Sequence, residues 1–312
     1  MIYAILDLGT NTFNLLIIQT AANNTRKILL SRKEPVKLGE DGITKGLISE
    51  KAFNRGLSAI ESHMKYIHDY QAEHIFAYAT SAIRSAGNGL EFVRLVYERF
   101  NIGIQVISGD KEAELIYRGV RQAVNMGNTK HLVLDIGGGS NELIIADGRK
   151  IYWKKSFPLG MARLLEQFRP SDPVTEEEIR LFENHFENSL ECFLKAAREH
   201  KPEILIGSSG SFDTFKALLA SATQTSPETN SPAFSIDPED FHKLYRRLLE
   251  SNSAERLEME GMDPMRVEMI VIAAIFVNFI VRRLGIQTMI QSDYSLKEGA
   301  VSEIIERKIL SA

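Results

Sequence analysis

The sequence uses one short unit twice: an apolar segment that ends in Asp-x-Gly and is followed at once by a second apolar segment. The first copy spans residues 2–19 and carries Asp-Leu-Gly-Thr-Asn at 7–11. The second spans residues 131–146 and carries Asp-Ile-Gly-Gly-Gly-Ser at 135–140. Each copy predicts two strands joined by a glycine turn. Two matched hairpins in one chain indicate two halves that are built alike.

Strands and helices alternate after each hairpin, which is typical of α/β proteins. Further strands are predicted at 28–36, 75–79, 104–107, 150–157, 204–206 and 286–291. Helices are predicted at 49–70, 90–100, 111–124, 176–199, 212–222, 238–250, 264–284 and 297–310, with an exposed loop at 221–235. A chain of 312 residues exceeds the usual size of one hydrophobic core. We therefore expect two α/β domains, residues 1–126 and 127–297, with a cleft between them.

Charge and hydropathy exclude several classes of protein. A formal net charge of -4 argues against a protein that coats nucleic acid. The most apolar stretch, residues 270–281, is too short to cross a bilayer and predicts a buried helix. The first residues show no basic leader, so we expect a cytoplasmic protein with neither membrane nor nucleic acid as partner. The single cysteine, Cys192, is expected to be buried and unreactive.

The two glycine turns predict a phosphate site. Backbone N–H groups converge on an anion at such turns, because no side chain blocks the approach and positive φ is accessible. The predicted phosphate-binding residues here are Gly9, Thr10, Asn11, Thr12, Gly137, Gly138, Gly139 and Ser140. Asp7 and Asp135 are predicted to hold a divalent cation, helped by Glu142, which shares a strand face with Ser140. Either turn alone would be explained better by an ordinary β-turn with a capping aspartate, but two turns in matching positions would not. A solvent-facing position explains Glu142 equally well.

Three other segments place polar side chains where a strand ends. Glu112 lies in the first turn of a predicted helix capped by Ser108 or Asp110, where the helix dipole favours its ionised form. We predict that it orients a water molecule, although a surface glutamate would look the same. Arg84 is predicted to clamp phosphate, with a surface arginine as the alternative. Ser208, Ser209 and Gly210 precede a helix and predict a further anion site.

Taken together, these segments resemble the exopolyphosphatase and guanosine pentaphosphate phosphohydrolase (Ppx/GppA) family. The likeness rests on residues 7–17, 79–84, 108–113, 134–143 and 207–211, in the order and spacing of that family. It implies two ribonuclease H-like domains of the actin, sugar-kinase and chaperone-ATPase superfamily, with a terminal helix at about 298–312 returning to the first domain. It also implies the release of terminal phosphate from polyphosphate, or of the 5′-phosphate from guanosine pentaphosphate, with Mg²⁺ or a similar cation. Glu112 matches the family's catalytic carboxylate, and a homodimer is among the expectations.

Two other functions fit the same residues. The first is a phosphotransferase of that superfamily, with a purine pocket near residues 207–212, and the second is a non-catalytic sensor of polyphosphate or guanosine tetraphosphate. One segment also departs from the family, because Ser295 and Lys297 stand where a glycine and an arginine are common. Lysine lacks the bidentate fork of arginine, so substrate orientation at this point stays open. The preferred substrate, the polymer length and the metal are likewise left open.

Overall fold

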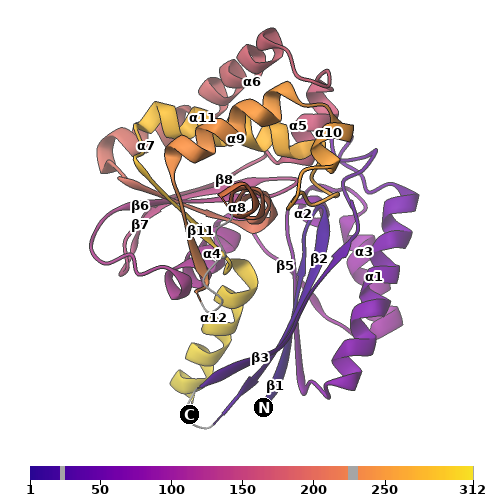
Figure 1. Cartoon of the computed structure of the whole chain (residues 1–312). Helices are drawn as coiled ribbons and strands as arrows, with labels where there is room; N and C mark the ends of the chain where they lie inside the picture. Colours follow the sequence, from indigo (N-terminus) through magenta and orange to yellow (C-terminus); the bar gives the residue numbers. More distant parts are fainter. Residues whose placement is uncertain (22–24, 224–230, 312) are drawn as a thin grey trace.

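The computed structural model describes residues 1–21, 25–223 and 231–311 and contains two mixed sheets (Figure 1). The first sheet has the order β3-β2-β1-β4-β5 and the second the order β10-β11-β9-β6-β7-β8. The first is built from β1 (Ile2–Leu8), β2 (Thr12–Thr20), β3 (Arg26–Pro35), β4 (His74–Ala79) and β5 (Ile104–Val106). The second is built from β6 (His131–Ile136), β7 (Asn141–Ala146), β8 (Ile151–Phe157), β9 (Ile204–Ser208), β10 (Ala233–Ile236) and β11 (Thr288–Ser292).

The two sheets follow the same plan. Each sheet begins with three antiparallel strands, β1–β3 in the first sheet and β6–β8 in the second. Two parallel strands then extend the sheet from its first strand: β4 and β5 beside β1, and β9 and β11 beside β6. Among the strands of the described residues, only β10, an antiparallel edge strand, has no counterpart. The prediction of one unit used twice in an α/β chain is therefore confirmed.

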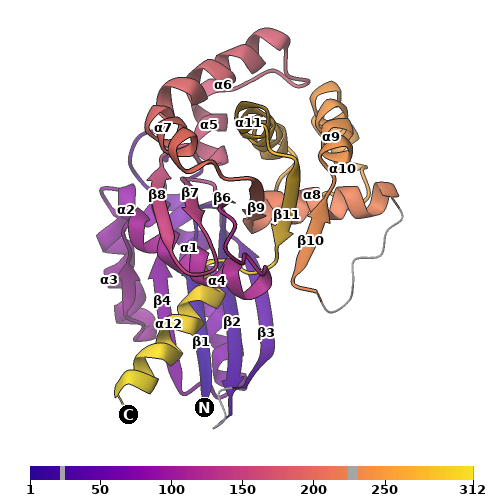
Figure 2. The same ribbon diagram turned by 90° about the vertical axis from the view of Figure 1, so that its left-hand side faces the viewer.

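Helices form three layers around the sheets (Figures 1 and 2). The outer face of the first sheet is covered by α1 (Glu50–Asp69), α2 (Ser81–Ser85) and α3 (Gly89–Phe100). The outer face of the second is covered by α5 (Met161–Phe168), α6 (Glu176–Ser189), α7 (Glu191–His200), α8 (Ser209–Thr223), α9 (Pro238–Glu250) and α11 (Met269–Leu284), with the short α10 (Ser253–Leu257) after α9. Between the sheets lie α4 (Gly109–Ala123) and α12 (Leu296–Ser311).

The central strands explain why this arrangement is stable. Side chains of β1 and β6 alternate between an outer core and the core that α4 and α12 share: Tyr3 and Ile5 face the shared core, whereas Ala4 and Leu6 face outward. Val133 of β6 likewise faces the shared core. Both faces of these strands are covered, so their sequences are continuous apolar runs rather than alternating ones.

The terminal helix α12 packs closely against α4 and also contacts β1. A Cβ atom on Gly299 would lie 1.7 Å from the carbonyl oxygen of Leu115, and one on Gly119 would lie 1.9 Å from that of Ser295. Only glycine permits so close a helix crossing. Both α4 and β1 belong to the first half of the chain, so α12 packs against elements of that half. The domain boundary at 126/127 stays a prediction.

Several predicted elements differ from the observed ones. The helix predicted at 176–199 is two helices that meet at Leu190, and the one predicted at 264–284 begins only at Met269. The loop predicted at 221–235 includes the end of α8 and strand β10, and its residues 224–230 lie outside the described residues. Short elements such as α2 and α5 were not predicted, because a few residues give too little periodicity.

Two predictions about exposure have opposite outcomes. Residues 270–280 of α11 are buried, as expected, and no helix in the described parts of the chain is both long and apolar enough to span a membrane. Cys192, however, is exposed rather than buried, and its Sγ lies 3.3 Å from Nζ of Lys155. The apolar residues of α7 face inward, and this leaves Cys192 on the outer side of the helix.

Candidate functional site

The β1–β2 turn and the β6–β7 turn touch each other. A Cβ atom on Gly138 would lie 2.6 Å from side-chain atoms of Asn11, and one on Gly139 would lie 2.6 Å from Oγ1 of Thr10. None of the four glycines in the two turns has a positive φ, so the turns do not use the positive φ that the sequence led us to expect. Gly138 and Gly139 are needed because the turns approach each other so closely, whereas a Cβ atom on Gly9 or Gly137 would crowd the carbonyl oxygen of Thr12 or Ser140 in its own turn.

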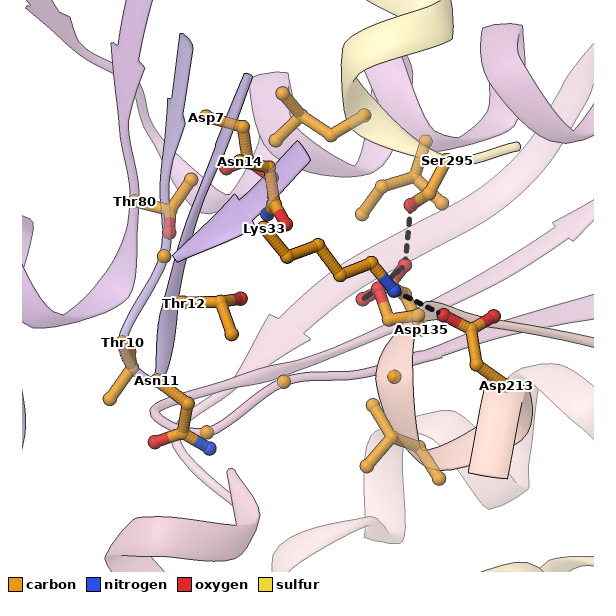
Figure 3. Close-up of a pocket in the computed structure, with 18 of the residues that line it drawn as sticks. Asp7, Thr10, Asn11, Thr12, Asn14, Lys33, Thr80, Asp135, Asp213 and Ser295 are labelled. Carbon is orange, nitrogen blue, oxygen red and sulfur yellow. Dashed lines mark hydrogen bonds and ion pairs between the residues drawn. The ribbon is translucent and has the colours of Figure 1, made fainter. Parts of the chain in front are cut away.

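A cleft of about 530 Å³ opens beside the paired turns (Figure 3). It is lined by nearly all of the predicted site residues: Asp7, Gly9, Thr10, Asn11, Thr12, Glu112, Asp135, Gly137, Gly138, Gly139, Ser140, Glu142, Ser209 and Gly210. The two predicted residues that do not line it are Arg84 and Ser208. Residues from both halves of the chain are therefore brought to one place.

Asp135 is held by three serine hydroxyl groups. Ser208 Oγ donates to Oδ2 at 2.6 Å, Ser209 Oγ at 2.7 Å and Ser295 Oγ at 2.6 Å. Ser208 lies beside Asp135 in the parallel register of β6 and β9, which explains why its hydroxyl reaches Oδ2 of Asp135. Ser295, which departs from the family pattern, thus supplies the third donor. Figure 3 shows it above Asp135.

Glu112 is buried and forms an ion pair with Arg84. Ser108 caps α4 by accepting from the Lys111 N–H, and this places Glu112 in the first helical turn as predicted. Nη1 of Arg84 lies 2.8 Å from Oε2 of Glu112 and also donates to the carbonyl of Ile107. Arg84 therefore contacts the candidate catalytic carboxylate instead of lining the cleft.

The electrostatics of Glu112 differ from the expectation based on its helix. Burial, opposed by Arg84 and reinforced by the charges of Asp7 and Asp135, raises the pKa of Glu112 to about 7. The helix dipole was expected to keep this group a weak base, but desolvation outweighs it. A carboxylate that titrates near neutrality is a better proton acceptor at pH 7 than an ordinary one.

Two more carboxyl groups of the site have raised pKa values. Burial raises the pKa of Asp7 to about 6, although Asn14 Nδ2 donates to it at 2.9 Å. Burial and the nearby charges of Glu112 and Asp135 raise the pKa of Glu142 well above its ordinary value. Glu142 also accepts from Ser140 Oγ at 2.8 Å, so the predicted shared strand face is confirmed and the solvent-facing alternative is wrong.

These carboxyl groups are compatible with a hard cation, although they do not form a closed ligand set. Across the described residues, no three His, Cys, Asp or Glu side chains converge as a ready metal site. Mg²⁺ does not need one, because it takes oxygen ligands and keeps several water molecules. Asp7 and Asp135 both line the cleft, and both raise the pKa of Glu112 through their negative charge. A cation held by Asp7 and Asp135, with help from Glu142 in the same cleft, would offset this charge.

Four cationic residues of the cleft were not predicted to bind phosphate: Lys33, Lys216, Arg266 and Lys297. Nζ of Lys33 reaches from β3 to Oδ2 of Asp213 on α8, 2.6 Å away, as Figure 3 shows. The Nε atom of the buried Arg266 has no hydrogen-bond partner among the described residues. Lys33 could have been found from hairpin register, since Asp7 pairs with Asn14 and Asn14 with Lys33.

Lys297, which replaces an arginine common in the family, lines the cleft and is half-buried. Its Nζ lies 3.0 Å from Oε1 of Glu298. Burial disfavours its charge, but Glu298, Asp7 and Asp213 together raise the pKa of Lys297, so it stays protonated. The side chain therefore keeps a positive charge beside Asp7.

Comparison with known proteins gives a consistent result. The family model for the Ppx/GppA phosphatase family matches residues 16–308. Exopolyphosphatase 1 of Mycobacterium leprae is 25% identical over 298 residues, which cover 95% of this chain and 87% of that protein. The crystal structure of an exopolyphosphatase from Cytophaga hutchinsonii is 34% identical and has a TM-score of 0.95, covering 98% of both chains. The Aquifex aeolicus PPX-GPPA enzyme is 26% identical with a TM-score of 0.79, covering 96% of this chain and 98% of that one.

Proposed function

The chain belongs to the Ppx/GppA phosphatase family, and on that basis we propose that it releases orthophosphate from the end of inorganic polyphosphate. The substrate class is supported by the relatives named as exopolyphosphatases. The observation that carries the proposal is the position of Glu112, a buried carboxylate with a pKa of about 7 beside two glycine turns in one cleft. Guanosine pentaphosphate is the second candidate substrate, supported by the family description and the Aquifex relative.

In the proposed reaction, water attacks the terminal phosphorus in line with the bridging oxygen. Glu112 accepts a proton from this water as the new P–O bond forms, and the bond from phosphorus to the bridging oxygen breaks. The shortened polymer leaves as a phosphate anion. Arg84 holds Glu112 in place through their 2.8 Å ion pair.

The paired turns would bind the reacting phosphoryl group. Residues 9–12 and 137–140, with the hydroxyl groups of Thr10 and Thr12, line the cleft beside Glu112. The N–H groups of Gly9 and Gly137 already donate within their own turns, so the donors would come from the other turn residues. Fixed donors of this kind stabilise the negative charge of a transition state without reorganising. Lys33, Lys216 and Arg266 would take the following phosphates of the polymer, because they are cationic and line the same cleft.

Mg²⁺ is the divalent cation that we propose for this site, with Asp7 and Asp135 as its ligands. When bound, it would offset negative charge on the phosphoryl oxygens. Dialysis against EDTA is expected to abolish phosphate release, and added Mg²⁺ to restore it. Undiminished release after dialysis would contradict the proposed metal requirement.

The proposed function is tested by incubating the protein with Mg²⁺ and, separately, polyphosphate, guanosine pentaphosphate or a nucleoside triphosphate. Released orthophosphate is then measured. We expect release from polyphosphate. Binding of polyphosphate with no release from any substrate would support the sensor and exclude the hydrolase. Transfer from the nucleotide to an added acceptor instead of water would support the phosphotransferase.

A further inference from the structure

A second hollow lies behind the Arg84–Glu112 ion pair. It has a volume of about 440 Å³, and we call it the rear hollow. It shares Ser81 and Ser140 with the cleft, so the two spaces adjoin. Its lining also includes Arg84, Lys155 and Arg163. None of the cleft cations Lys33, Lys216, Arg266 and Lys297 lines it.

Side-chain contacts separate the cleft from the rear hollow. Glu112 and Glu142 line the cleft, whereas their partners Arg84 and Ser156 line the rear hollow. The contacts are the 2.8 Å ion pair of Arg84 with Glu112 and the 2.6 Å hydrogen bond from Ser156 to Glu142. Side-chain contacts of this kind break by rotamer changes, which need no movement of the backbone.

The charge of the rear hollow is suited to an anion. Arg163 donates to the carbonyl oxygens of Gly139 and Ile43, and Lys155 lies near Cys192 and over the ring of Phe157. Neither side chain forms an ion pair with a carboxylate of the described residues. One acidic residue, Asp110, lines the rear hollow, and Glu166 acts on Arg163 from outside it. The positive charges of Lys155 and Arg163 are therefore only partly offset.

We propose that the rear hollow binds the orthophosphate released from the cleft and is its route out of the enzyme. This proposal rests on the proposed function. The cleft cations line the cleft and not the rear hollow, so the polymer that they hold would occupy the cleft and leave the rear hollow free. The released orthophosphate therefore lies between the shortened polymer and the Arg84–Glu112 pair, and leaving through the rear hollow would not require the polymer to be displaced.

The proposed reaction itself would open this route. Glu112 becomes neutral when it accepts the proton of the attacking water, and its ion pair with Arg84 is then lost. Arg84 is left to pair with the phosphate anion, whose bidentate geometry suits a guanidinium. Loss of the proton from Glu112 to solvent restores the ion pair and closes the route.

The test is orthophosphate binding to protein whose cleft is already filled. In an E112Q background, which is expected to bind polyphosphate without hydrolysing it, the protein is saturated with polyphosphate and titrated with radiolabelled orthophosphate in equilibrium dialysis. We expect one orthophosphate site. Lys155→Glu should weaken it by about fivefold or more, whereas Lys150→Glu, an exposed lysine stacked on Tyr152 at the other end of β8, should not.

Two outcomes would overturn the proposal. Orthophosphate that no longer binds once polyphosphate is present would show that the polymer fills both spaces, and Lys155→Glu should then raise the KM for polyphosphate. Orthophosphate that binds Lys155→Glu and Lys150→Glu equally would place its site elsewhere. Failure of the proposed function is a separate result, because it would appear as no phosphate release by the wild-type protein.

Discussion

The first turns of α4 and α12 occupy equivalent places in the two halves of the molecule. Each helix follows the last parallel strand of its sheet, and each carries a buried glutamate after a lysine: Lys111-Glu112 in α4 and Lys297-Glu298 in α12. Glu112 lines the cleft and pairs with the distant Arg84, whereas Glu298 does not line it and pairs with its neighbour Lys297. The duplicated fold thus supplies two similar carboxylates, and their partners and access to the cleft decide which one does chemistry.

The largest expected difference is between Glu112→Gln and Glu298→Gln. Glu112→Gln should lower kcat for phosphate release by about 100-fold or more, because a glutamine cannot accept the proton of water. Glu298→Gln should keep kcat within about tenfold, since Glu298 does not reach the cleft, and should lower Tm because a buried ion pair is lost. Steady-state phosphate release and thermal unfolding measure the two effects. Equal losses of activity in both variants would remove the distinction between the helices.

The next effect concerns the partner of Glu112. Arg84 lowers the pKa of Glu112 against the effect of burial, so Arg84→Ala should raise that pKa further. The acid limb of the pH–rate profile should move up by roughly one to three pH units. Arg94→Ala, which removes an arginine paired with Glu98 on the surface of α3, is the control and should leave the limb unchanged. An unmoved limb in Arg84→Ala would mean that another group controls the pH dependence.

The smallest expected effect is on the pH dependence of thermal stability, through Asp7 at the end of β1. The folded-state pKa of Asp7 is about 6, above its ordinary value of 3.8, so folding favours the protonated form. That stabilisation is full below about pH 4 and is lost as the pH rises through 6. Asp7→Asn should therefore raise Tm at pH 8, by about 2–4 °C for each kcal/mol relieved, and change it little at pH 4. A lower Tm at pH 8 would show that the negative charge stabilises the fold.

Sequence reasoning predicted the parts of the molecule that depend on local pattern. The duplicated hairpins and the helix start before Glu112 follow from short segments with strong signals. The start of α8 was predicted less well, because the helix begins at Ser209 and includes Ser209 and Gly210, which were expected to precede it. Alternation from Ser140 into β7 was enough to place Ser140 and Glu142 on one face.

The contacts that tertiary packing creates could not be predicted in this way. Arg84 and Glu112 are 28 residues apart and Lys33 and Asp213 are 180 apart, and nothing local to either residue indicates its partner. The same limit explains the error on the pKa of Glu112, because the helix dipole can be inferred from sequence whereas the burial that outweighs it cannot. The exposure of Cys192 was missed for the same reason.

The central claim is that Glu112 activates water because burial brings its pKa near neutrality. The most direct test is the pH dependence of kcat/KM for polyphosphate in the wild-type protein, since this ratio reports ionisations of the free enzyme. We predict an acid limb with an apparent pKa of about 7, the value given by burial of Glu112 against the charges around it. A limb near pH 4 to 5, where an ordinary carboxyl group titrates, would contradict the claim.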